Sequence, residues 1–139
     1  MVVTLMVAAL SLSACQGASE EAPSGNEPAR IEPVEGTKLG RVILTAKAAE
    51  RLGIETAPVR DAEAGGAQRT AIPYAAVLYD PNGETWAYTS PEPLVFIRAP
   101  ITIDRIDGDQ AFLLDGPPPG TAVVTVGAVE LYGTELGIE

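Results

Sequence analysis

Tyr74-Ala75-Ala76-Val77-Leu78-Tyr79-Asp80-Pro81-Asn82-Gly83-Glu84-Thr85-Trp86-Ala87-Tyr88-Thr89 is the stretch of this chain that decides its fold. Two β-prone runs, 74–79 and 85–89, flank the turn sequence Asp-Pro-Asn-Gly. Proline presets φ at the second position of a turn, and glycine accepts the left-handed conformation that a turn often requires. The stretch therefore predicts a β-hairpin.

Further short strands are expected downstream of this hairpin. Residues 94–106 read as a long strand region interrupted by Pro100, and further apolar runs follow at 110–114, 123–126 and 129–132. Turn residues separate these runs at 107–109 and 116–120. Short strands at this spacing, joined by Gly, Pro and Asp, predict a mainly β fold, a small antiparallel β-barrel or sandwich.

The region upstream of the hairpin predicts one short helix between two strands. Residues 41–44 are β-prone, Thr45 is an N-cap candidate for a helix over about 45–52, and Gly53 stands at the usual C-terminal position. Residues 54–60 return to strand character, and the small residues of 61–67 indicate a flexible connector. We expect a single β-domain over 40–139.

Residues 15–39 predict a tether rather than a folded element. The sequence from 16 to 39 is rich in Glu, Pro, Ser, Ala and Gly, has no aromatic residue and has few aliphatic ones. Such a stretch cannot bury enough apolar surface to offset its ordering entropy. We therefore expect a flexible, acidic, disordered linker before the domain.

The composition excludes several classes of function. The 139 residues include nine basic and nineteen acidic ones, for a net charge of −10, and no histidine. Binding to nucleic acid or to anionic headgroups needs clustered Lys and Arg, so neither is expected. Without histidine there is no Ser-His or Cys-His pair and no imidazole ligand. We predict no enzymatic activity, no metal site and no cofactor.

The remaining side chains offer weaker candidates. Asp104, Asp107 and Asp109 do not have the spacing of a calcium loop, so a polar turn is the simpler interpretation. Carboxylate catalysis remains a remote alternative, since nothing in the spacing singles out a pair. Four aromatic side chains of the hairpin form a candidate interaction surface, although cross-strand packing is their ordinary role: Tyr74, Tyr79, Trp86 and Tyr88.

The N-terminus resembles a bacterial lipoprotein leader. An uncharged apolar run precedes Leu12-Ser13-Ala14-Cys15, which is similar to a lipobox, and Cys15 is the only cysteine. The resemblance implies a signal peptide over 1–14, cleavage after Ala14 and a lipid on Cys15. No Lys or Arg precedes Cys15, which indicates either a translation start further upstream or a weak leader. The expected location is the cell envelope, facing the periplasm, and Gln16 favours the outer membrane.

The β-region carries a second resemblance. Residues 72–80, 83–88, 98–103 and 120–135 resemble the membrane-proximal region of periplasmic adaptor subunits of RND-type efflux systems, also called membrane fusion proteins, HlyD-like. Residues 44–59 resemble the N-terminal strand-helix-strand of the same adaptors. In a complete adaptor a lipoyl-like domain, a helical hairpin and a β-barrel separate these two regions, whereas here only 61–67 do.

These resemblances imply an accessory role in transmembrane transport. The leading hypothesis is a lipid-anchored periplasmic protein that binds an inner-membrane RND pump or a full-length adaptor through protein contacts. The alternative is a stand-alone envelope lipoprotein that binds a small ligand or another envelope protein. A deep pocket lined by Trp86 and the tyrosines would favour that alternative.

Overall fold

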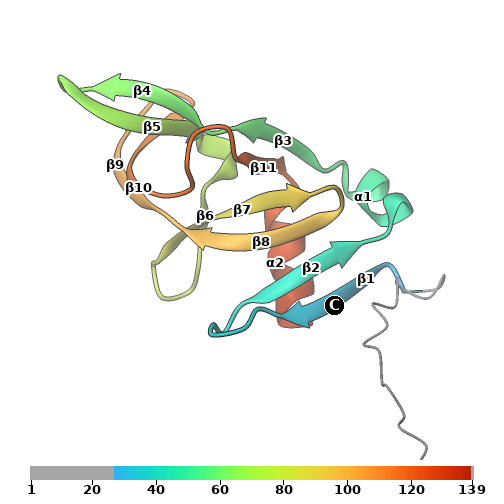
Figure 1. The fold of residues 1–139 in the computed structure, drawn as a ribbon. Coiled ribbons are helices and arrows are strands. Elements are labelled where there is room, and N and C mark those ends of the chain that lie inside the picture. The colour runs from blue at the N-terminus through green and yellow to red at the C-terminus, as the bar shows by residue number, and fades with distance from the viewer. Residues whose placement is uncertain (1–26, 139) are drawn as a thin grey trace, which may run out of the picture.

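The computed structural model describes residues 27–138. These residues form a mainly β structure, with two α-helices and one turn of 3-10 helix (Figure 1). The strands are β1 Ala29–Pro33, β2 Gly40–Leu44, β3 Glu55–Pro58, β4 Arg60–Ala64, β5 Ala67–Pro73, β6 Leu78–Tyr79, β7 Thr85–Glu92, β8 Val95–Pro100, β9 Thr102–Asp107, β10 Gln110–Asp115 and β11 Ala122–Val126. The helices are α1 Ala46–Leu52, the 3-10 turn η1 Tyr74–Ala76 and α2 Ala128–Leu136.

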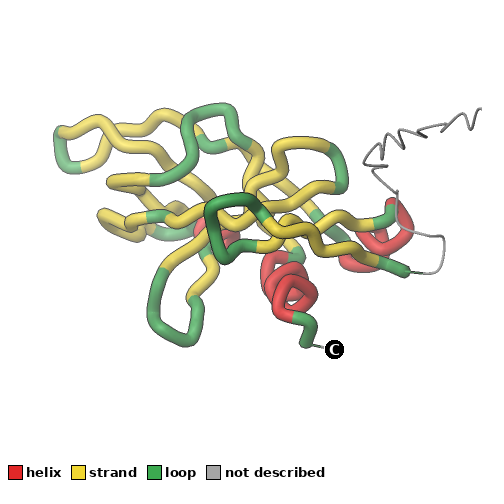
Figure 2. Tube along the Cα trace, turned by 60° about the horizontal axis from the view of Figure 1, so that its bottom comes forward, coloured by secondary structure: helices red, strands yellow, loops and turns green. Residues whose placement is uncertain are grey.

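The strands form two antiparallel sheets. The seven-stranded sheet has the order β1-β2-β8-β7-β11-β3, with β6 also paired to β7, and the four-stranded sheet has the order β4-β5-β10-β9. Neither sheet closes on itself, so the barrel in our expectation is wrong, while the mainly β antiparallel class is confirmed. Figures 1 and 2 show the four-stranded sheet at one end of the molecule and α1 at the other.

The chain passes from the seven-stranded to the four-stranded sheet at two similar points. β3 ends at Pro58 and β4 begins after Val59, while β8 ends at Pro100 and β9 begins after Ile101. Proline cannot donate a ladder hydrogen bond, so it ends the pairing on each strand. The aliphatic residue that follows is buried in both cases, Val59 at 1% exposure and Ile101 at 5%. These two crossovers divide the chain between two open sheets instead of one barrel.

The domain has two apolar cores, one on each face of the seven-stranded sheet. Tyr88 and Val124 belong to the core under the helices, whereas Ala87 and Val123 belong to the core that includes residues of the four-stranded sheet. Because side chains alternate between the faces of a strand, β7 and β11 are buried on both sides. This double burial explains why their sequences contain apolar runs rather than a clean polar alternation.

Several sequence-based expectations are confirmed. The turn at 80–84 joins β6 to β7, where Leu78 pairs with Trp86 and Tyr79 with Thr85. Helix α1 has the predicted caps: the Thr45 side chain accepts a hydrogen bond from the backbone N–H of Ala48, and Gly53 adopts the left-handed conformation. The strand region interrupted at Pro100 is also present, as β8 and β9.

Other expectations are wrong. The run 129–132, read as a strand, belongs to α2, so the domain has two α-helices rather than one short helix. The first half of the hairpin is shorter than expected, because 74–76 form the turn η1. Residues 61–67, expected as a flexible connector, form most of β4, the turn and the first residue of β5, with Ala64 paired to Ala67 across Gly65 and Gly66.

The expected tether ends earlier than residue 39. Residues 29–33 form β1, which pairs in full with β2 and places Ala29 against the helix-side core. Its sequence, Ala-Arg-Ile-Glu-Pro, is too short and too polar to be recognised alone as a strand, but pairing with β2 satisfies its backbone. The domain therefore includes β1, and its boundary lies near residue 28.

Candidate functional site

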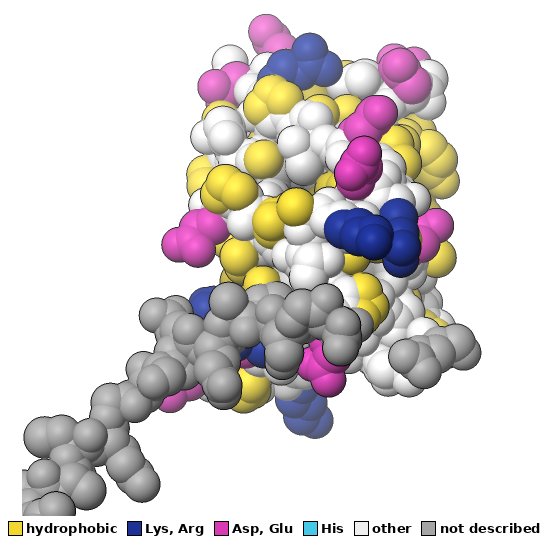
Figure 3. All heavy atoms as spheres, turned by 90° about the vertical axis from the view of Figure 1, so that its right-hand side faces the viewer, with side chains coloured by type: hydrophobic (Ala, Val, Ile, Leu, Met, Phe, Trp, Pro, Cys, Tyr) yellow, Lys and Arg dark blue, Asp and Glu magenta, His cyan; other side chains and the backbone are white. Residues whose placement is uncertain are grey.

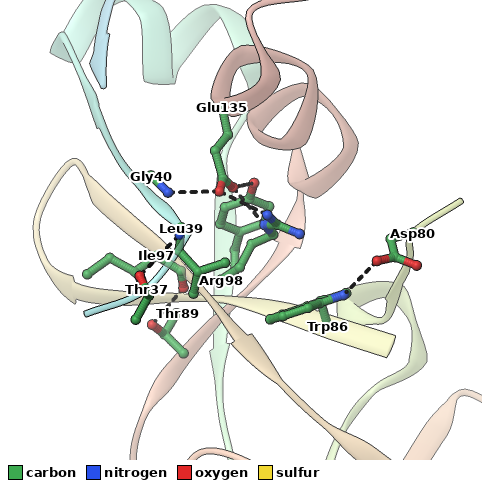
Figure 4. Close-up of polar contacts among 10 residues, drawn as sticks. Thr37, Leu39, Gly40, Asp80, Trp86, Thr89, Ile97, Arg98 and Glu135 are labelled. Atoms are coloured by element: carbon green, nitrogen blue, oxygen red, sulfur yellow. Dashed lines mark hydrogen bonds and ion pairs between the residues drawn. The ribbon is translucent and has the colours of Figure 1, made fainter. Parts of the chain in front are cut away.

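The loop between β6 and β7 is held by one carboxylate. Asp80 Oδ1 accepts hydrogen bonds from the backbone N–H groups of Asn82 and Glu84, both at 2.9 Å. Asp80 Oδ2 accepts one from the indole Nε1 of Trp86 at 3.3 Å (Figure 4). The loop is therefore fixed, and the indole of Trp86 is oriented by the same side chain.

The base of this loop is joined to the second crossover. Thr85 Oγ1 donates to the carbonyl of Ile101 at 2.7 Å, and the Ile101 N–H donates to the carbonyl of Thr85 at 3.0 Å. An open groove of about 590 Å³ lies between these segments. We call it the hairpin groove. Its lining residues are Tyr79, Gly83, Glu84, Thr85, Trp86, Pro100, Ile101, Thr102, Ile103 and Ile106.

The structure brings two of the four predicted aromatic residues to this groove. Tyr79 and Trp86 line it, and Tyr79 is 51% exposed. Tyr74 is exposed beside them, and a side-chain hydrogen bond with Tyr74 raises the pKa of Tyr79, so the two phenols are neighbours. Tyr88 is fully buried and does not belong to the predicted surface, because its face of β7 is covered by α2.

Arg98, which contacts the Trp86 ring, forms a buried ion pair with Glu135, and we call this pair of Arg98 of β8 and Glu135 of α2 the clasp. Arg98 Nε donates to Glu135 Oε2 at 2.7 Å and Arg98 Nη2 donates to Oε1 at 3.0 Å. The Tyr88 hydroxyl also donates to Oε2, and the Gly40 N–H donates to Oε1 at 3.0 Å (Figure 4). Glu135 thus joins α2 to three strands.

Aromatic rings complete the surroundings of Arg98. Its guanidinium carbon lies 4.8 Å from the ring centroid of Trp86 and 4.9 Å from that of Tyr132. Both distances are within the range of a cation–π interaction. The Arg98 side chain is 10% exposed and that of Glu135 4%. The hairpin groove and the clasp therefore share Trp86.

The electrostatics of these carboxylates agree with a structural role. Burial disfavours the charge on Glu135, but hydrogen bonds from Arg98, Tyr88 and Gly40 outweigh it and lower the pKa of Glu135. Burial, followed by the hydrogen bond to Glu135, raises the pKa of Tyr88. The pKa of Asp80 is lowered as well, since hydrogen bonds from the loop outweigh desolvation. The carboxylates of Asp80 and Glu135 both accept hydrogen bonds from protein donors and have lowered pKa values, so the charged form of each is stabilised.

The acidic residues of the β9 region form no ligand cluster. Asp104 pairs with Arg69, with 2.9 Å between Oδ2 and Nε, and Asp107 and Asp109 flank the β9–β10 turn. Within residues 27–138 no group of three or more potential ligands is positioned to hold a metal ion. In the same range no helix is long and apolar enough to cross a bilayer. Cys15 and Ala14 lie outside the described residues.

The charged side chains around the hairpin groove differ from those at the α1 end of the molecule. At the α1 end, acidic, basic and apolar side chains are interspersed (Figure 3). The hairpin groove differs, because its lining contains Glu84 and no Lys or Arg. Among the residues that the structure describes, the groove thus combines an aromatic and aliphatic lining with negative charge.

Sequence reasoning missed four residues of this site. Ile103 and Ile106 both line the groove, although residues three positions apart in a regular strand face opposite sides. A β-bulge in the β9–β10 pairing lies between them and changes the alternation. Arg98 and Glu135 meet although they lie 37 residues apart in sequence. The available signal for Glu135 was its place in the series Ala128, Leu131, Tyr132 and Glu135, which has helical spacing.

Comparisons with known proteins found one structural likeness. No family model matches the chain, and no curated protein matches it. The chain is similar to an NMR structure of 180 residues encompassing the N-terminal metal-binding site and the membrane proximal domain of SilB from Cupriavidus metallidurans CH34. The identity is 20% and the TM-score 0.47, over 86% of this chain and 89% of that chain.

Proposed function

We propose that this chain is an adaptor-like accessory protein of an RND-type efflux system, anchored by lipid at Cys15 and acting through protein contacts. The observation that carries the proposal is the interleaving of the two segments that resemble adaptors. β2 pairs with β8, and β3 pairs with β11, so the N-terminal segment borders the C-terminal one on both sides. Together they form one seven-stranded sheet.

The junction between the two segments supports the same proposal. In a complete adaptor the lipoyl-like domain, the helical hairpin and the β-barrel would separate them, whereas here the β4–β5 hairpin turns at Gly65 and Gly66. Both glycines have positive φ, 60° and 76°, as a two-residue hairpin turn requires. A short hairpin thus stands where the inserted domains would lie in a complete adaptor.

The form of the surface favours a protein partner over an enclosed small molecule. The hairpin groove is open to solvent, and Tyr79 and Ile106 on its walls are 51% and 45% exposed. Small-molecule sites generally enclose most of their ligand. An exposed aromatic and aliphatic surface around a rigid loop is typical of a protein interface.

In-cell crosslinking tests this function. A photoreactive phenylalanine analogue replaces Tyr79 in the hairpin groove, and in a matched control it replaces Glu63, which is exposed on β4. We expect crosslinking from position 79 to an inner-membrane RND pump or a full-length adaptor, identified by mass spectrometry, and not from position 63. Crosslinks from position 79 only to unrelated envelope proteins, or none at all, would contradict the adaptor role.

A further inference from the structure

We propose that the hairpin groove recognises an extended protein segment that presents an aliphatic side chain next to Lys or Arg. This inference deepens the proposed function. It rests on that function in one respect, namely that the partner in the groove is a protein. It follows from three properties of the groove: its preformed shape, its apolar floor and its acidic rim.

The groove is preformed because two independent sets of hydrogen bonds fix its walls. Asp80 holds the β6–β7 loop through Asn82, Glu84 and Trp86, and the reciprocal pair between Thr85 and Ile101 holds the loop against the crossover. A binding surface that is already ordered loses little conformational entropy when a partner docks. Binding therefore does not require the loop to fold first.

The floor and walls of the groove match an aliphatic side chain. Trp86 is held at Nε1 by Asp80 and on its ring by Arg98, and its remaining surface lines the groove beside Ile101. Tyr79 and Ile106 extend the apolar surface outward. Arg98 already covers part of the Trp86 ring, and the indole surface that remains for a partner is bordered by aliphatic side chains. The side chain that contacts Trp86 should therefore be uncharged.

The rim supplies the preference for positive charge. Glu84 is exposed, is the only charged lining residue and lies in a loop whose other carboxylate, Asp80, is held by hydrogen-bond donors. A positively charged residue adjacent to the aliphatic one would meet Glu84 at the entrance. Complementary rim charge sets the choice of partner more than it adds affinity. Acidic segments with the same apolar residues should bind more weakly.

The single tryptophan of the chain reports directly on this site. Three capped peptides without aromatic residues serve as probes: Lys-Leu-Lys-Leu-Lys, Glu-Leu-Glu-Leu-Glu and Lys-Ser-Lys-Ser-Lys. Each is titrated into the purified full chain while Trp86 fluorescence and the indole N–H resonance are followed. We expect the Lys/Leu peptide to shift both signals, the Lys/Ser peptide to shift neither, and the Glu/Leu peptide to bind about tenfold more weakly.

Two charge-reversal variants separate recognition from general electrostatics. Glu84→Lys changes the rim, and Glu92→Lys makes the same change at an exposed position at the other end of β7. Glu84→Lys should invert the order of the Lys/Leu and Glu/Leu peptides, whereas Glu92→Lys should leave it unchanged. Backbone amide spectra confirm that both variants are folded.

The inference is overturned if the Lys/Leu peptide leaves the Trp86 signals unchanged at millimolar concentration, if both Leu peptides bind equally, or if the two variants behave alike. These outcomes are distinct from failure of the adaptor role. The crosslinking experiment can identify a pump or an adaptor even where the peptide preference is absent, and the peptide preference can hold for a partner of another class.

Discussion

At the scale of single residues, Glu135 connects more elements than its place near the end of a short helix suggests. Its carboxylate accepts four hydrogen bonds, from Arg98, Tyr88 and Gly40, and thereby connects α2 to β8, β7 and β2. Gly40 is needed at this point, since a Cβ there would lie 2.8 Å from Ile31 and 3.0 Å from Glu135. The close approach of strand and helix depends on both residues.

Glu135→Gln should destabilise the domain by about 3 kcal/mol, because it leaves the buried Arg98 guanidinium without a counter-charge. Glu130→Gln, an exposed change on the same helix, should alter the free energy of unfolding by less than about 0.5 kcal/mol. Urea denaturation of both variants measures the difference. Equal changes in the free energy of unfolding for the two variants would mean that the clasp stabilises the domain no more than a surface charge does.

The effect of Glu135 should also depend on pH with a definite sign. Its folded-state pKa is lowered, so its contribution is present above the unfolded value of about 4.3 and is lost as pH falls through the folded pKa. The stability gap between wild type and Glu135→Gln should therefore be full at neutral pH and shrink below about pH 4. A gap that persists unchanged at lower pH would contradict the ionised clasp.

At the scale of elements, the sequence predicts structure that depends on neighbouring residues, but not structure that depends on contacts between distant residues. The caps of α1 and the turn of the β6–β7 hairpin are encoded within a few residues, and both were predicted. Helix α2 was read as a strand, because residues 129–132 were taken as a short apolar run. The burial of Glu135 depends on Arg98, which is distant in sequence.

The start of α2 shows a further long-range constraint. Gly127 has φ 95°, and a Cβ there would lie 2.3 Å from Ile54 Cδ1. The sequence marks Gly127 only as an interruption in an apolar run, whereas in the structure it lets the chain turn against Ile54. Four residues of the candidate site, Ile103, Ile106, Arg98 and Glu135, were missed for the same reason, because they come together only through tertiary contacts.

The β4–β5 turn should tolerate insertion. Ten Gly/Ser residues placed between Gly65 and Gly66, which are both exposed, should cost about 1–2 kcal/mol, the closure entropy of a longer loop. The same insertion between Gly120 and Thr121 should cost more, because it separates two hydrogen bonds that these residues make with the buried Val59, each contributing about 1 kcal/mol. Thermal unfolding compares the two, and equal losses would argue against an insertion point at this turn.

At the scale of the whole molecule, the proposed lipid and the proposed interface have separate tasks. The hairpin groove belongs to the described domain, whereas Cys15 precedes Glu27 by a stretch that the sequence predicts to be a tether. A tethered domain is held at a raised local concentration near its partner, so even a weak contact can be occupied. The open groove and its single rim charge are consistent with a contact of that strength.

Cys15→Ser should therefore release the protein from the membrane fraction without unfolding it, because no residue of either core lies near Cys15 in the sequence. Cell fractionation followed by immunoblotting measures the release, and circular dichroism of the soluble protein measures its folding. Ser13→Ala, a small-for-small change before the cleavage site, is the matched control and should remain in the membrane fraction. Should the Cys15→Ser protein also remain there, contacts of the β-domain would be sufficient for attachment, and adding Glu84→Lys would show whether the hairpin groove makes them.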